Sequence, residues 1–215
     1  MRSGKQISIA WYAVSDYVTA AAAWICFIFI QQWMLKEMND ESTSLPVHSV
    51  FWLKVLLIPA GWLLFYAVLG SYHSLYKKSR LFEFTSTFVC SLLGTIILFF
   101  LFIVNHKVSD NAYYYFAFLS LLALHFIFIF TGRWIILNMA KKQLLKGTVY
   151  FNTLMIGSQE NAVRIFKETE KNMHNDGYRY AGFVTPNDNS KNGILKFIPK
   201  LGHINQLEKI IDENN

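Results

Sequence analysis

Charged residues are scarce in this sequence of 215 residues, because Asp, Glu, Lys and Arg together make up 16% of it, against roughly 25% in ordinary soluble domains. Cysteine is almost absent, and Cys26 and Cys90 lie in apolar stretches without the spacing of a disulfide framework or a metal site. The six histidines form no zinc-ligand set. These shortages argue against an ordinary soluble domain and predict no metal centre in this chain.

What the sequence has instead is long apolar runs, at residues 8–30, 50–69, 84–104 and 113–137. Each is close to the roughly 20 residues that cross the hydrocarbon core of a bilayer. We therefore predict a transmembrane domain of four helices over residues 1–137, with the lipid bilayer as its partner. The net charge of +6 does not indicate nucleic acid, because the basic residues flank apolar runs and form no patch interleaved with aromatic residues.

The basic residues also predict an orientation. Lysine and arginine gather in the segments before the first span, between the second and third, and around the end of the fourth (Arg2, Lys5, Lys77, Lys78, Arg80, Arg133, Lys141, Lys142 and Lys146), whereas the opposite loops carry Lys36 and Lys107. Short loops rich in these residues stay in the cytoplasm. Both termini of this multi-pass protein are therefore expected there.

Three ionisable residues fall within the predicted spans, where such groups are costly and mark functional candidates. For Asp16 we favour a satisfied polar contact between helices over a ligand site. His125 is expected to form a hydrogen bond between packed helices. Lys54, near a helix end, is expected to extend its ammonium group towards the headgroups.

The loop GSYHSLYKKSRLFEF, residues 70–84, carries Lys77, Lys78 and Arg80. These side chains are candidates for contact with a lipid-linked phosphate or with anionic lipids. The alternative is that they only set the orientation of the spans. Glu83 suits the positive N-terminus of the third span and can pair with Arg80 three residues earlier.

After a cytosolic linker at residues 138–152, short strands and amphipathic helices replace the apolar runs. Residues 153–158 and 178–185 are predicted strands, 159–172 and 204–211 are predicted helices, and ILKFIPKLG supplies a further short strand. On the first helix, Ala162, Ile165, Phe166 and Thr169 share the predicted buried face. This order indicates a parallel sheet, a Rossmann-like α/β domain over residues 153–215. A further strand would be needed to complete the sheet, so the domain is expected to be the N-terminal part of a larger one.

A nucleotide site is the functional candidate in this domain. Gly157 ends the first strand, and Ser158 and Asn161 could donate to an anion beside the helix start. The full dinucleotide fingerprint needs three glycines, and Gly157 is alone. A Rossmann-like scaffold without a ligand is therefore the alternative.

The loop at residues 70–84, the span YYYFAFLSLLALHFIFIFTGR and the strand FNTLMIGS together resemble the N-terminal region of the polyprenyl-phosphate glycosyl-1-phosphate transferases, which initiate bacterial exopolysaccharide and O-antigen assembly. The resemblance covers essentially the whole chain, and Gly-x-Tyr followed by Lys-Ser-Arg-Leu-x-Glu is its most specific part. It implies a membrane-anchoring and regulatory or dimerisation region in the bacterial inner membrane. It also implies a nucleotide sugar as a ligand and a homodimer. Transfer to polyprenyl phosphate would belong to a later domain with an Asp-Glu pair and Mg²⁺.

The chain itself offers no catalytic residues. Its adjacent acidic pairs, Asp40-Glu41 and Asp212-Glu213, lie in an external loop and at a helix end, and we give neither a catalytic role. Turnover by this chain alone is therefore not expected. Two other interpretations stay open: the front of a membrane-bound nucleotide-sugar dehydratase, and a non-catalytic membrane scaffold for polysaccharide assembly.

Overall fold

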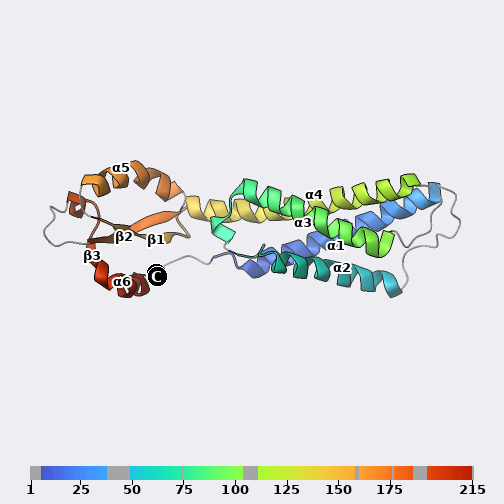
Figure 1. Cartoon of the computed structure of the whole chain (residues 1–215), viewed down its shortest axis with the longest axis horizontal. Coiled ribbons are helices and arrows are strands. Elements are labelled where there is room, and N and C mark those ends of the chain that lie inside the picture. Colours follow the sequence, from blue (N-terminus) through green and yellow to red (C-terminus); the bar gives the residue numbers. More distant parts are fainter. Residues whose placement is uncertain are drawn as a thin grey trace. The chain divides into compact units, whose positions relative to one another are not determined.

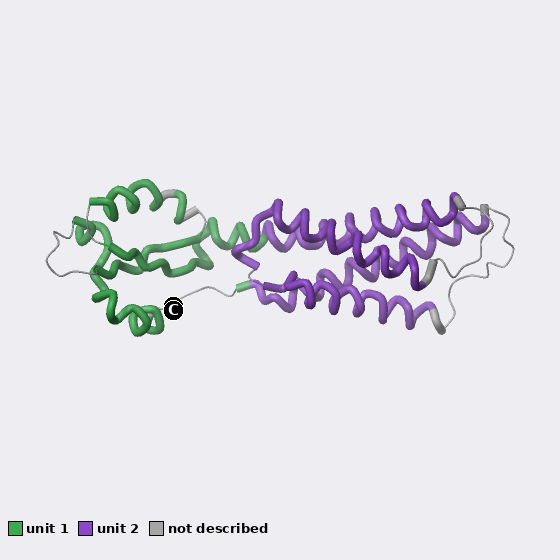
Figure 2. The backbone as a smooth tube through the Cα atoms, in the orientation of Figure 1, with its two compact units in different colours: residues 1–6, 139–215 green, residues 7–138 purple. Residues whose placement is uncertain are grey.

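The fold is taken from a computed structural model, which describes residues 6–37, 49–73, 75–103, 111–157, 160–175, 177–185 and 193–214. The orientation charges Arg2, Lys5 and Lys107, the pair Asp40-Glu41 and the candidate Ser158 lie outside these residues. The chain divides into two compact units, residues 7–138 and residues 1–6 with 139–215 (Figure 2).

The first unit consists of long helices (Figure 1): α1 Ile9–Glu37, α2 Ser49–Val68, α3 Arg80–Leu98 and α4 Asn111–Leu145, the last of which continues into the second unit. A short 3-10 helix, η1 Leu75–Lys77, precedes α3, and a π-helical turn, η2 Phe99–Ile103, follows it. Within the described part of the chain, these four helices are long and apolar enough to cross a membrane. The four predicted spans are therefore present as helices.

Two helix boundaries differ from the predicted spans. Helix α3 begins at Arg80, because the Ser79 side chain caps it by accepting a hydrogen bond of 3.1 Å from the Phe82 amide. Helix α4 continues to Leu145, eight residues past the predicted end of the span. No proline or glycine lies between Leu137 and Leu145 to stop it.

Aromatic and aliphatic side chains fill the centre of the helical unit, including Trp24, Phe27, Trp62, Tyr66 and Leu121. Small residues set the spacing of α1 and α4. A Cβ atom at Gly132 would lie 2.9 Å from both Ser15 Oγ and Thr19 Cγ2, so a larger side chain there would force the two helices apart.

The second unit is a three-stranded parallel sheet in the order β1-β2-β3, formed by β1 Phe151–Ile156, β2 Tyr178–Thr185 and β3 Lys200–His203. Helix α5 Glu160–Asn175 and helix α6 Leu207–Asn214 lie on opposite sides of it (Figure 1). The 3-10 helices η3 Gly193–Lys196 and η4 Ile204–Gln206 precede β3 and α6. The predicted parallel sheet is confirmed.

The core of this unit lies between α5 and the sheet and includes Met155, Ala162, Phe166 and Phe183. Ala162 and Phe166 face inward as predicted, but Ile165 is 47% exposed. Because a helix advances 100° per residue, Ile165 falls outside the narrow face that the small sheet covers.

Candidate functional site

A cluster of paired charges in the helical unit centres on Arg133 of α4, which is fully buried. Its Nη2 lies 2.7 Å from Asp16 Oδ2 and its Nε 3.1 Å from Asp16 Oδ1, a two-point contact with α1. Its Nη1 donates to Glu83 Oε1 at 2.9 Å and to Thr87 Oγ1 at 3.0 Å, both on α3. The guanidinium fork therefore joins three helices.

Three further side chains surround these carboxylates. The Tyr12 hydroxyl donates to Glu83 Oε1, and Lys78 Nζ lies 2.9 Å from Glu83 Oε2. The Tyr72 hydroxyl donates to Asp16 Oδ2 at 3.1 Å. Burial, and then the Asp16 carboxylate beside it, raise the pKa of Tyr72 above its ordinary value, so the phenol keeps the proton that it donates.

We call Asp16, Lys78, Glu83 and Arg133 the buried charge network. It contains two carboxylates and two cations and therefore has no formal net charge. Burying an ion costs several kcal/mol unless it is paired and hydrogen-bonded. The network meets this condition because each carboxylate is paired with at least one cation. These pairs connect α1, α3, α4 and the segment before α3, which carries Lys78.

An aromatic layer lies against the network. Arg133 Cζ is 4.2 Å from the centre of the Tyr66 ring, and the Tyr66 hydroxyl lies 3.0 Å from His125 Nε2. The His125 ring stacks on Trp62 with a centroid distance of 3.6 Å. His125 thus forms the predicted hydrogen bond between helices, and Asp16 forms the predicted polar contact.

Sequence reasoning missed the part played by Arg133 and paired Glu83 with the wrong arginine. Glu83 contacts Arg133 and Lys78, whereas Arg80 donates to Asn138 Oδ1 at 3.0 Å. The available signal was an arginine inside the fourth apolar run, together with one carboxylate inside the first run, Asp16, and another just before the third, Glu83. An isolated arginine there would need such a partner.

The structure separates the three basic residues of the loop at residues 70–84. Lys78 points inward to Glu83, and its side chain is 9% exposed. Lys77 is exposed, and the exposed Arg80 places its guanidinium 4.9 Å from the centre of the Trp134 ring. A lipid-phosphate contact stays a prediction for these residues, with Arg80 and Lys77 as the outward-facing pair.

In the α/β unit, Gly157 connects β1 to the segment before α5. Its φ of +128° is a conformation that residues with a side chain rarely adopt. Its amide donates to the Val184 carbonyl at 2.9 Å. Asn161 is exposed in the first turn of α5, next to Glu160. The carboxylate of Glu160 already suits the positive helix end, and a nucleotide site here stays a prediction.

Metal ligands are not brought together among the described residues, because no three His, Cys, Asp or Glu side chains gather there in a group that could hold an ion. The carboxylates of Asp16 and Glu83 instead pair with Arg133 and Lys78. The buried charge network thus links α1, α3 and α4 through paired charges.

Comparison with known proteins identifies one family. A model described as a CoA-binding domain matches residues 67–215, and this domain is found in polyprenyl-phosphate sugar transferases. The match includes Lys78, Glu83 and Arg133 as well as the α/β unit. No curated protein and no solved structure matches the chain. Because the matched region is more than half of the sequence, the chain belongs to the CoA-binding domain family.

Proposed function

We propose that this chain is the membrane-anchoring and regulatory or dimerisation portion of a sugar transferase. The enzyme would move a sugar phosphate from a nucleotide sugar to polyprenyl phosphate in exopolysaccharide, capsule or O-antigen biosynthesis. The observation that carries the proposal is the family match, which runs from the end of α2 through the α/β unit and includes both apolar helices and the small parallel sheet.

The helical unit supports the anchoring role. Its helices are long and apolar, and their outer surfaces carry many exposed leucine, isoleucine, valine and phenylalanine side chains. The ionisable side chains Asp16, Glu83 and Arg133 are paired with one another inside. This pattern of an apolar outside and paired charges inside is the one that a bilayer requires. The proposed location is the bacterial inner membrane, with both termini in the cytoplasm.

The α/β unit would supply the regulatory part by binding a nucleotide sugar near Gly157 and Asn161, or by contacting a second copy. Mg²⁺ and polyprenyl phosphate belong, in this proposal, to a catalytic domain outside residues 1–215. The described residues hold no cluster fit for the metal, so no chemical step is assigned to this chain.

Deletion of the gene in its source bacterium tests the proposal. Membranes of the parent strain, incubated with a panel of radiolabelled UDP-sugars, are expected to transfer label into the lipid extract. Membranes of the deletion strain are expected to lose one of these labelled lipids, and a plasmid copy of the gene should restore it. Equal labelling of every lipid in the two strains would contradict the proposed function.

Substitution of Gly157 tests the regulatory part. Gly157→Val is expected to weaken UDP-sugar binding by about tenfold or more, or ~1.4 kcal/mol, because valine cannot adopt a φ of +128° without strain. Isothermal titration of the purified full chain in detergent measures the affinity for each UDP-sugar, and coenzyme A is titrated as the comparison ligand.

Gly193→Ala is the matched control, since an added Cβ there meets only a side-chain atom, Val163 Cγ2 at 3.3 Å. Circular dichroism verifies that both variants keep their secondary structure. Unchanged affinity in Gly157→Val would remove Gly157 from the site. Binding of coenzyme A in preference to every UDP-sugar would reject a nucleotide sugar as the ligand.

A further inference from the structure

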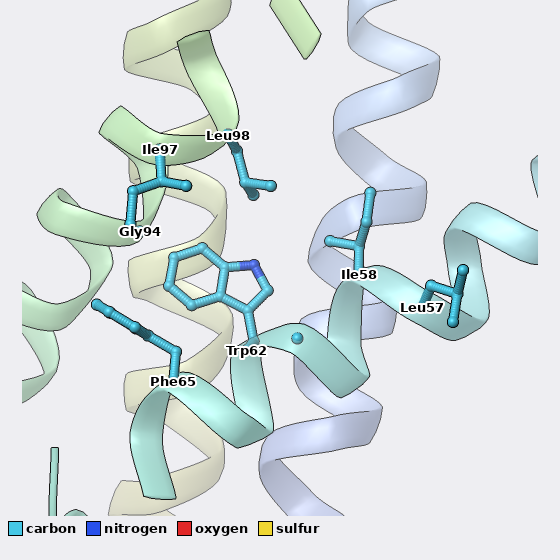
Figure 3. Close-up of a pocket in the computed structure, with 8 residues that line it drawn as sticks. Leu57, Ile58, Trp62, Phe65, Gly94, Ile97 and Leu98 are labelled. Carbon is cyan, nitrogen blue, oxygen red and sulfur yellow. The ribbon is translucent and has the colours of Figure 1, made fainter. Parts of the chain in front are cut away.

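Helices α2 and α3 border a cavity of about 340 Å³ (Figure 3). The side chains around it are leucine, isoleucine, phenylalanine and tryptophan, and two glycines, Gly61 and Gly94, complete the wall. The cavity is partly open. Leu57 and Ile97 at its rim are 56% and 49% exposed, whereas Ile58 and Trp62 are buried. It is therefore a recess in the outer surface of the helical unit.

The two glycines have opposite surroundings. A Cβ atom on Gly94 would lie 2.2 Å from the Trp62 ring, so Gly94 lets this ring pack directly on α3. A Cβ atom on Gly61 would meet no atom within 4 Å. The Trp62 ring also stacks on the His125 ring, at a centroid distance of 3.6 Å. Trp62 thus forms a fixed wall of the recess, and Gly61 leaves space beside it.

The lining restricts the occupant. Ordered water needs two to four polar partners, and the indole nitrogen of Trp62 is the sole polar side-chain atom among the lining residues. A helix of a second copy is a rigid rod about 10–12 Å across with its side chains, so it presents only its side chains to a recess between two packed helices. A hydrocarbon chain is thin, flexible and apolar, and it is the medium against which a membrane-spanning helix lies.

We propose that the recess between α2 and α3 holds one acyl chain of a bilayer phospholipid, which packs against Trp62 and over Gly61. This inference rests on the membrane placement in the proposed function and goes beyond it by assigning a bound lipid to a site. The bound acyl chain would fill the space that α2 and α3 leave between them and would stabilise the contact between these two helices.

The test uses the full chain purified in dodecyl maltoside and depleted of lipid. Palmitoyl-oleoyl phosphatidylglycerol is titrated back, and the unfolding midpoint is followed by tryptophan fluorescence while native mass spectrometry counts retained lipid. The wild type is expected to retain one phospholipid and to show a saturable rise in midpoint. Gly61→Leu, which fills the recess, is expected to lose the retained lipid and most of the rise.

Two control variants separate the effect of filling the recess from the effects of helix propensity and of added side-chain bulk. Gly61→Ala gives the helix the better propensity of alanine but adds one carbon atom, so it should still respond to lipid. Ala60→Leu places the same leucine side chain at the neighbouring exposed position, which does not line the recess, and it should respond like the wild type.

An equal lipid response in wild type and Gly61→Leu would overturn the proposal. So would retention of added undecaprenyl phosphate in place of phospholipid, or a mass showing that a second copy of the chain blocks the recess. A failure of the membrane placement itself would give a different result from a failure of the lipid site, because the purified protein would then stay dispersed in buffer without detergent.

Discussion

Replacement of Arg133 by leucine is expected to destabilise the helical unit by about 3–5 kcal/mol, the cost of breaking a buried ion pair by removing one partner. Asp16 and Glu83 would remain buried with Lys78 as their single cation in the network. The midpoint of thermal unfolding of the purified chain in detergent, followed by tryptophan fluorescence, measures the loss.

Arg80→Leu is the matched control, because Arg80 is exposed and donates to Asn138 outside the network. Exposed ion pairs and hydrogen bonds contribute little to the stability of the fold. The unfolding midpoint of Arg80→Leu should therefore stay close to that of the wild type. Adding Asp16→Asn to Arg133→Leu removes the excess negative charge and should restore part of the stability. Equal midpoints for Arg133→Leu and Arg80→Leu would show that the network does not stabilise the fold.

Gly182→Val is expected to destabilise the α/β unit by about 1–3 kcal/mol through overpacking. A Cβ atom at this position in β2 would lie 2.6 Å from the Pro199 carbonyl oxygen and 2.6 Å from Leu201 Cγ. The oxygen belongs to the backbone, so no change of side-chain conformation relieves the clash, and β3 must move away from β2. Hydrogen–deuterium exchange of the full chain, with mass spectrometry, should show faster exchange in β2 and β3.

Ala181→Val is the control for this substitution. It places the same valine side chain at the preceding, half-buried position of β2. Because successive side chains of a strand point to opposite faces, this valine lies on the other face of the sheet from one at position 182. Exchange in α1 to α4 should be unaffected in both variants. If Gly182→Val left the protection of β2 and β3 at the wild-type level, the tight contact between these strands would be refuted.

Sequence periodicity predicted the elements that depend on local pattern. The strand at residues 178–185 coincides with β2, and all four apolar runs form helices. Gly157, predicted to lie at the end of the first strand, follows β1 directly and has a positive φ, while its part in a nucleotide site stays a prediction. Local pattern is informative in these cases because residues close in sequence decide periodicity and turn conformation.

The contacts of Arg133 could not be predicted in this way. Its partner Asp16 is 117 residues distant in sequence, and Glu83 is 50 residues distant. Which carboxylate faces which cation depends on how the helices rotate and pack, so the nearby Arg80 was a reasonable but wrong partner for Glu83. The same applies to Ile165, whose exposure depends on how much of α5 the small sheet covers.

In the proposed membrane location, the neutrality of the buried charge network has an electrical consequence. Moving one unpaired elementary charge through the full field is worth about 2.3 kcal/mol per 100 mV. Because the charges of Asp16 and Glu83 cancel those of Lys78 and Arg133, moving the four groups together transfers no net charge. The membrane potential therefore does no net work on these four side chains when they move together.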